Sequence, residues 1–270
     1  WFTNPKARLV VVEHHSNALK GVQDWTLTLI NHWLAHATVY LTDQYRDQVK
    51  RKLKCFLFNK RVHVISNGLD LEVYKPLENR DFDNKDLVFG MQGRMTESKD
   101  YPTLFYAFAK FRESAAAGGK ARLEIAGDGP MRAELEKLAK VLGIADAVDF
   151  LGMIPQEEMI GRLQNWDIFV LSTLGETMSR ALMEAQACGV PLVASDVSGV
   201  SAAIDHGKTG MLVPAKDPDS LAATLVSLTE QPGVRREMAE NSKRHAVESF
   251  SADQSWKRYR EVVGKVLAEY

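Results

Sequence analysis

The segment that decides the fold is STLGETMSRALMEAQACGVPLVAS, residues 172–195. Its first two residues complete the apolar run IFVLST at 168–173, which is short and rich in branched residues and so predicts a buried parallel strand. Small and apolar residues then recur at helical spacing until Gly189 and Pro191. A second apolar run, PLVAS, predicts the next strand. This order predicts a βαβ unit, whose ligands bind beyond the carboxyl ends of the strands.

Two carboxylates in this segment indicate a binding site for one long ligand. Glu176 follows the predicted strand, and Glu184 lies eight positions later in the predicted helix. If all of that offset is helical, the two backbones are about 12 Å apart. The carboxyl groups of glycosidases are about 5 to 9.5 Å apart, so we interpret this pair as ligand contacts. We expect the amides of Thr177, Met178 and Ser179 to open the helix, with its positive dipole toward an anion.

Composition is that of an ordinary globular protein, with 45% hydrophobic and 26% charged residues. The length of 270 residues predicts about two domains. Residues 1–79 carry 11 Lys plus Arg against 7 acids, and the remainder carries 23 against 28. The net charge of −1 gives no argument for a nucleic-acid partner.

The two cysteines indicate the redox compartment of the protein. Cys55 and Cys188 lack the spacing of a metal site or a disulfide framework, so we expect structural thiols in a reducing compartment.

No run approaches 18 apolar residues, and no membrane-spanning helix is predicted. Because the chain opens on Trp1 without a charged-then-apolar leader, we expect its natural start to lie upstream.

The fold class predicted is α/β. Strand and helix patterns alternate regularly over residues 80–250, which predicts a complete doubly wound, Rossmann-like parallel sheet. The charged stretch near residue 80 marks the predicted domain boundary. Residues 1–79 hold about three strands, too few for an independent domain, and are interpreted as a partial Rossmann-like domain. Residues 251–270 predict a closing helix, which we expect to pack back toward the first domain.

Two loops after predicted strands supply further ligand groups. GRMTESKDYP places Arg94 and Lys99 in one loop, and a guanidinium with an ammonium is a common combination on phosphate oxygens. Taken alone, this loop is better explained as a solvated basic loop in which Gly93 serves only the turn. In AGDGPMRAEL, Gly127 and Gly129 allow a tight turn into a helix. That motif lacks the full spacing of a dinucleotide fingerprint.

In combination, these segments resemble glycosyltransferase family 4, the retaining nucleotide-sugar enzymes of the GT-B fold, over about residues 60–260. The motifs that carry the resemblance occur in the family's order: VISNGLDLEVYKP, GRMTESK, GDGPMRAEL, FLGMIPQEEM and ETMSRALMEAQACGVPLVAS. The commoner family form has Gly, Phe and Gly after the first Glu, where this chain has Thr177, Met178 and Ser179. This departure bears on the identity of the sugar more than on the activity.

The resemblance implies a donor site along the strand ends. Arg94 and Lys99 would hold the diphosphate of the donor, Glu176 the sugar hydroxyls and Glu184 the ribose. Residues expected close to the base are Asp128, Gly129, Gly152 and Met153. Two cations at the diphosphate stabilise the charge of the leaving group without a metal, so we expect neither a metal nor another cofactor.

A histidine in residues 1–79 is the remaining catalytic candidate. By the resemblance, this segment is the back half of the acceptor domain, and the family commonly carries a histidine there that faces the donor sugar. We select His14, which follows Glu13 at a predicted strand end, together with Arg94, Lys99 and Glu176 as the catalytic set. His15 is the alternative, and an ordinary loop histidine is the plainer interpretation.

Residues 50–61 hold six basic residues among apolar ones. Such a mixture suits peripheral contact with an anionic membrane, but a solvated helix with its apolar side in the core is the favoured interpretation. Asp81 and Asp83 form a DxD sequence outside any core strand, which we interpret as coincidental.

The sequence therefore predicts a retaining, metal-independent glycosyltransferase that moves a hexose-type sugar from a UDP- or GDP-sugar to an acceptor hydroxyl. A glycan or glycolipid acceptor is expected, with a role in cell-surface polysaccharide or lipid-linked glycan synthesis. The expected location is cytoplasmic, with peripheral contact at the membrane face. Two alternatives remain: a nucleotide-sugar-binding module that needs a partner for turnover, and an isomerase or phosphorylase on the same fold.

Overall fold

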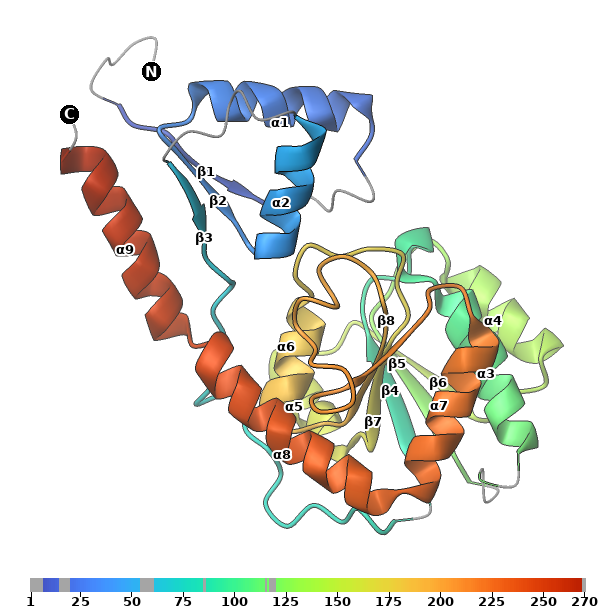
Figure 1. Ribbon diagram of the computed structural model, residues 1–270. Helices are drawn as coiled ribbons and strands as arrows, with labels where there is room; N and C mark the ends of the chain where they lie inside the picture. Colours follow the sequence, from blue (N-terminus) through green and yellow to red (C-terminus); the bar gives the residue numbers. More distant parts are fainter. Residues whose placement is uncertain are drawn as a thin grey trace.

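The computed structural model describes residues 7–14, 20–53, 61–84, 86–114, 116 and 120–268, which form two parallel sheets (Figure 1). His15, Cys55 and most of the basic run at 50–61 lie outside the described residues.

The smaller sheet has three parallel strands in the order β1-β2-β3. Its elements in chain order are β1 (Val10–Glu13), α1 (Val22–Leu34), β2 (Ala37–Tyr40), α2 (Asp43–Lys52) and β3 (Val62–Val64). Side chains alternate across β2, so that Val39 joins one apolar cluster and Tyr40 the other. The Tyr40 cluster includes residues of α1 and α2. The Val39 cluster includes Val262 and Val266 of the last helix, α9 (Ala252–Ala268).

The larger sheet has six parallel strands in the order β6-β5-β4-β7-β8-β9. These are β4 (Val88–Gln92), β5 (Arg122–Ala126), β6 (Val148–Gly152), β7 (Ile168–Leu171), β8 (Leu192–Ser195) and β9 (Met211–Val213). The chain builds outward from β4 to one edge and then from β7 to the other. The switch point therefore lies between the carboxyl ends of β4 and β7, where ligands of this fold bind.

Helices cover both faces of the larger sheet. The helices between β4 and α9 are η2 (Glu97–Lys99), α3 (Tyr101–Glu113), α4 (Arg132–Val141), α5 (Gln156–Asn165), α6 (Arg180–Ala187), α7 (Pro218–Glu230) and α8 (Pro232–Ser249). Helix α3 contacts α4 and α7 on one face, and α6 contacts α8 on the other (Figure 1). The predicted doubly wound sheet, with a second and smaller parallel sheet, is confirmed.

Helix α8 was not predicted from the sequence. Its buried positions include polar side chains, among them Arg235 and Ser242, so the apolar repeat that identifies an amphipathic helix is weak. The Arg235 guanidinium donates to the carbonyl of Thr229 at 2.8 Å, and Ser242 Oγ donates to the carbonyl of Thr209 at 2.6 Å. Hydrogen bonds of this kind allow polar groups to lie in the core.

Two segments of the chain run side by side between the sheets. One, the crossing segment, joins β3 to β4, and the other is the junction of α8 with α9. Leu69 N–H donates to the carbonyl of Phe250 at 2.7 Å, and Ala252 N–H donates to the carbonyl of Leu69 at 3.1 Å. A Cβ on Gly68 would lie 2.5 Å from Ala252 Cα, so only glycine permits this approach. Further along the first segment, the half-buried Arg80 guanidinium donates to the carbonyls of Gly189 and Trp166, each at 2.7 Å. The Arg80 side chain therefore fixes the first segment to main-chain carbonyls of the larger-sheet part of the chain.

Candidate functional site

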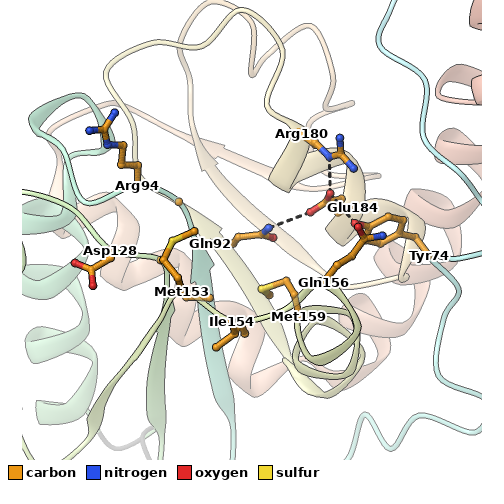
Figure 2. A pocket seen from close by; sticks show the side chains of 13 residues that line it. Tyr74, Gln92, Arg94, Asp128, Met153, Ile154, Gln156, Met159, Arg180 and Glu184 are labelled. Carbon is orange, nitrogen blue, oxygen red and sulfur yellow. Dashed lines mark hydrogen bonds and ion pairs between the residues drawn. The ribbon is translucent and has the colours of Figure 1, made fainter.

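A cavity of about 550 Å³ lies at the carboxyl ends of β4, β5 and β6, closed on one side by α6 (Figure 2). Four of the predicted site residues line it: Arg94, Asp128, Met153 and Glu184. The cavity thus lies on the β4 side of the switch point.

Glu184 is the centre of a hydrogen-bond network at one end of the cavity (Figure 2). Its Oε1 accepts from the Tyr74 hydroxyl and from Arg180 Nε, each at 2.8 Å, and its Oε2 accepts from Gln92 Nε2 at 3.1 Å. Only 3% of Glu184 is exposed. A carboxylate offers about four acceptor positions, so these three bonds leave one on Oε2 for a ligand.

Sequence reasoning missed three members of this network. Tyr74 comes from the segment that crosses between the sheets, Gln92 from the end of β4 and Arg180 from the first turn of α6. Burial, followed by the hydrogen bond to Glu184, raises the pKa of Tyr74 to about 12. Arg180 precedes Glu184 by one helical turn, a spacing that brings side chains together and was the one available signal.

Cations lie at both ends of the cavity. Arg94 follows β4 at the end opposite Glu184 and is exposed (Figure 2). The Arg180 side chain is 69% exposed, although its Nε is bound to Glu184. Arginine groups placed in this way match the separated negative charges of an elongated anionic ligand.

The glycine turns bring the loops at the strand ends into contact. Gly127 has φ of 135°, and a Cβ there would lie 2.1 Å from the carbonyl oxygen of Gly93. Its N–H donates to the carbonyl of Gly152 at 2.8 Å. A Cβ on Gly129 would lie 2.4 Å from the carbonyl oxygen of Met95. Glycine is therefore required where these turns form the cavity floor.

Asp128 and Met153 lie at the mouth of the cavity. The Asp128 carboxylate accepts from Gly129 N–H at 2.7 Å and from Arg132 at 3.1 Å, and these bonds lower its pKa. Met153 is 81% exposed. The cavity is also lined by Ile154, Gln156 and Met159, which lie in the motif FLGMIPQEEM but were not named as site residues from the sequence.

Lys99 and Glu176 lie outside this cavity lining and form an ion pair with each other. Their side chains are 19% and 16% exposed. The two loops are also joined through Ser98, whose carbonyl accepts from Leu174 N–H at 2.8 Å and from Thr173 Oγ1 at 2.9 Å. The ion pair therefore bridges the switch point between β4 and β7.

The expected helix start after Glu176 is wrong. Helix α6 begins at Arg180, and Ser179 is its N-cap, with Oγ accepting from Leu182 N–H at 3.4 Å. Thr177 and Met178 precede the helix, so their amides do not open it. A serine hydroxyl that satisfies a first-turn amide starts a helix at the following residue, and the sequence contained that signal.

Thr177 and Met178 instead contact the part of the chain that carries the smaller sheet. Thr177 Oγ1 donates to the carbonyl of His14, and Met178 Sδ accepts from Asn67 N–H at 3.4 Å. Met178 also lines a second cavity, of about 540 Å³, at this junction. His14 directly follows β1 and is exposed, so the structure places it beside the loop of Glu176.

Across the described ranges, no cluster of three or more His, Cys, Asp or Glu side chains has the arrangement of a metal site. Asp83 N–H donates to Asp81 Oδ1 at 2.9 Å, which makes the DxD sequence part of a local turn. None of the helices described in the structure is long and apolar enough to cross a membrane.

Residues 77–245 match the family of glycosyl transferases group 1. The chain belongs to the glycosyl transferases group 1 family. The match covers the larger sheet with its helices up to α8. Every residue that lines the cavity, except Tyr74, lies within the matched range.

Among named relatives in this family is the D-inositol 3-phosphate glycosyltransferase of Corynebacterium urealyticum, 32% identical over 69% of this chain and 47% of that protein. The alpha-D-kanosaminyltransferase of Streptomyces kanamyceticus is 31% identical over 77% of this chain and 55% of that protein. The chain spans about half the length of these curated relatives.

Solved structures support the GT-B type of fold. The HepE protein of Anabaena, crystallised with UDP and glucose, matches 95% of this chain and 71% of its own, with a TM-score of 0.83 and 20% identity. TarM of S. aureus matches 94% of this chain and 50% of its own, with a TM-score of 0.82 and 16% identity. At these identities the likeness concerns the fold of this group 1 family member.

Proposed function

We propose that this chain carries the donor site of a retaining, metal-independent glycosyltransferase of family 4. Its donor is a UDP- or GDP-linked hexose and its acceptor is a hydroxyl of a glycan or glycolipid. The observation that carries the proposal is the cavity on the β4 side of the switch point, which has Arg94 at one end and the buried Glu184 network at the other.

The cavity chemistry matches a nucleoside diphosphate. Glu184 keeps one acceptor position on Oε2, which suits a ribose hydroxyl. Met153, Ile154 and Met159 give an apolar surface that suits the flat face of a base. Arg94 supplies a fork of donors for phosphate oxygens.

The ion pair beside the cavity suits the sugar end of the same donor. In the proposed complex, Glu176 binds sugar hydroxyls and Lys99 shares its charge between Glu176 and the diphosphate. Arg94 and Lys99 together stabilise the negative charge that develops on the leaving diphosphate, which supports a reaction without a metal. The acceptor hydroxyl attacks from the face that the diphosphate leaves, and His14 faces the sugar from the side of the smaller sheet.

Product analysis tests the proposed reaction. The chain is incubated with UDP- or GDP-hexoses and a panel of glycan and glycolipid acceptors in EDTA, and mass spectrometry identifies the products. Free nucleoside diphosphate with a glycosylated acceptor is expected, and its anomeric configuration should match that of the donor. An epimerised nucleotide sugar or a released sugar phosphate would assign the fold to an isomerase or a phosphorylase instead.

Peripheral contact with the cytoplasmic face of a membrane is part of the proposal, with a role in cell-surface polysaccharide or lipid-linked glycan synthesis. Support comes from α1, whose outer face exposes Val22 and Trp33 by 86% and 75%. The basic end of α2 is close to this helix, since Lys52 Nζ lies 5.9 Å from the centroid of the Trp25 ring. An exposed apolar face beside basic residues suits an anionic bilayer.

A further inference from the structure

Helix α2 contacts the larger sheet through two glutamines that lie one turn apart. Gln48 Nε2 donates to Ser198 Oγ at 2.9 Å. Gly199 N–H donates to Gln44 Oε1 at 3.2 Å. Residues four apart share one face of a helix, so both glutamines contact the same turn, which follows β8.

The Ser198–Gly199 turn in turn supports Glu176. The Glu176 N–H donates to the carbonyl of Ser198 at 3.2 Å. Gly199 has φ of 80°, and a Cβ there would lie 2.1 Å from the carbonyl oxygen of Glu176. The two backbones are thus in direct contact, and a shift of the turn displaces Glu176 as well.

A third contact between the two parts of the chain lies at the next residue. Thr177 Oγ1 donates to the carbonyl of His14. Contacts from β1 and α2 therefore converge on both sides of Glu176, whereas the Glu184 network receives Tyr74 from the crossing segment and no group from α2 among the described residues.

We propose that Gln44 and Gln48 are positioning residues that hold Glu176 in place through the Ser198–Gly199 turn. The contact forms only when the smaller sheet and the larger sheet meet, so it couples their approach to the placement of one carboxylate. Its consequence for catalysis depends on the proposed function, in which Glu176 binds the donor sugar. The coupling between the two sheets and Glu176 does not depend on the proposed function.

Amide hydrogen exchange tests the coupling without any ligand. In the variant Gln44→Met/Gln48→Met, the side chains keep their length but lose both hydrogen bonds. Because both hydrogen bonds to the Ser198–Gly199 turn are lost, the exchange rate of the Glu176 amide, relative to that of Val170 in β7, should rise at least about tenfold. An unchanged ratio would overturn the proposal.

Three further variants sharpen that measurement. Gln44→Glu keeps an oxygen acceptor for the Gly199 amide and should leave the exchange ratio close to that of the parent chain. Ser198→Ala removes the partner of Gln48 from the other side and should raise the ratio. Lys50→Met changes an exposed residue of α2 and should leave the ratio unaltered.

Kinetics separates this proposal from the proposed function. The double variant should bind the nucleoside diphosphate with the affinity of the parent chain, while kcat for transfer falls about tenfold and the donor KM changes less than about twofold. Failure of the parent chain to bind UDP or GDP would reject the proposed function and leave the exchange result standing. A fall in nucleotide affinity with unchanged kcat would contradict the positioning role.

Discussion

Lys99 and Glu176, which follow different strands of the larger sheet, form an ion pair across the switch point between β4 and β7. Both side chains are mostly buried. The pair therefore joins the two loops from which a donor would be bound, and each charge holds the other in position.

Removing one member of this pair should destabilise the fold, because the other charge is left mostly buried without its partner. We expect Lys99→Met and Glu176→Gln each to lower the free energy of unfolding by about 2 kcal/mol, with a coupling energy of about 1 kcal/mol or more in the double variant. Urea unfolding measures all three. The exposed pair of Lys75 and Glu72 is the control and should show coupling of less than about 1 kcal/mol. Additive effects at Lys99 and Glu176 would show that the pair contributes no coupling.

Arg94 is expected to act on the ligand rather than on the fold. Because Arg94 is exposed at the end of the cavity, Arg94→Ala should leave the unfolding transition in place. Transfer should fall about a hundredfold, the effect of losing one donor to the charge that develops in the transition state. The control is Arg112→Ala, since Arg112 pairs with Asp146 away from the cavity. Full activity in both Arg94→Ala and Lys99→Ala would reject the assignment of these cations to phosphate.

Tyr74 should make stability sensitive to alkaline pH. Its pKa is raised to about 12, above the usual value near 10, so folding favours the protonated hydroxyl. This contribution is complete below about pH 10 and is lost as the pH rises toward 12. The difference in free energy of unfolding between the parent chain and Tyr74→Phe should therefore shrink over that range. A difference that stays constant from pH 9 to 12 would contradict the raised pKa.

Asp100 has a left-handed backbone, with φ of 38° and ψ of 43°, directly after Lys99. Its Oδ2 is buried and finds no hydrogen-bond partner among the described residues. Asp100→Gly removes both costs and should raise the free energy of unfolding by about 1 kcal/mol, measured by urea unfolding. Asn79, with φ of 58°, is exposed, and Asn79→Gly should change stability much less. Equal effects of the two substitutions would show that the buried carboxylate carries no cost.

Sequence patterns predicted the order of strands and helices in the larger sheet because its strands are continuous apolar runs separated by helical spacing. Arg94 and Glu184 were assigned to one donor site by the family resemblance; Arg94 follows the carboxyl end of β4, and Glu184 lies in α6, the helix that follows β7. The Tyr74 contact to Glu184 joins residues 110 positions apart, and no local pattern reports such a contact. The same reason explains why the Gln44 and Gln48 contacts to Ser198 and Gly199 were not predicted.

The ion pair between Lys99 and Glu176 was not predicted for a different reason. Each residue was assigned separately to a ligand, and their mutual contact depends on how closely the loops approach. Ser98, whose carbonyl accepts two bonds from the loop before Glu176, sets that approach. Motifs identify which residues carry chemistry, and packing decides which of them share a contact.

The most direct test of the donor site is calorimetric titration of the chain with UDP and with GDP, each in EDTA, beside the Arg94→Ala and Glu184→Gln variants. We predict saturable binding of one nucleotide to the parent chain and at least tenfold weaker binding to each variant, with their unfolding transitions as a check on folding. Binding of neither nucleotide, or equal binding by all three proteins, would contradict the assignment of the cavity to a nucleotide-sugar donor.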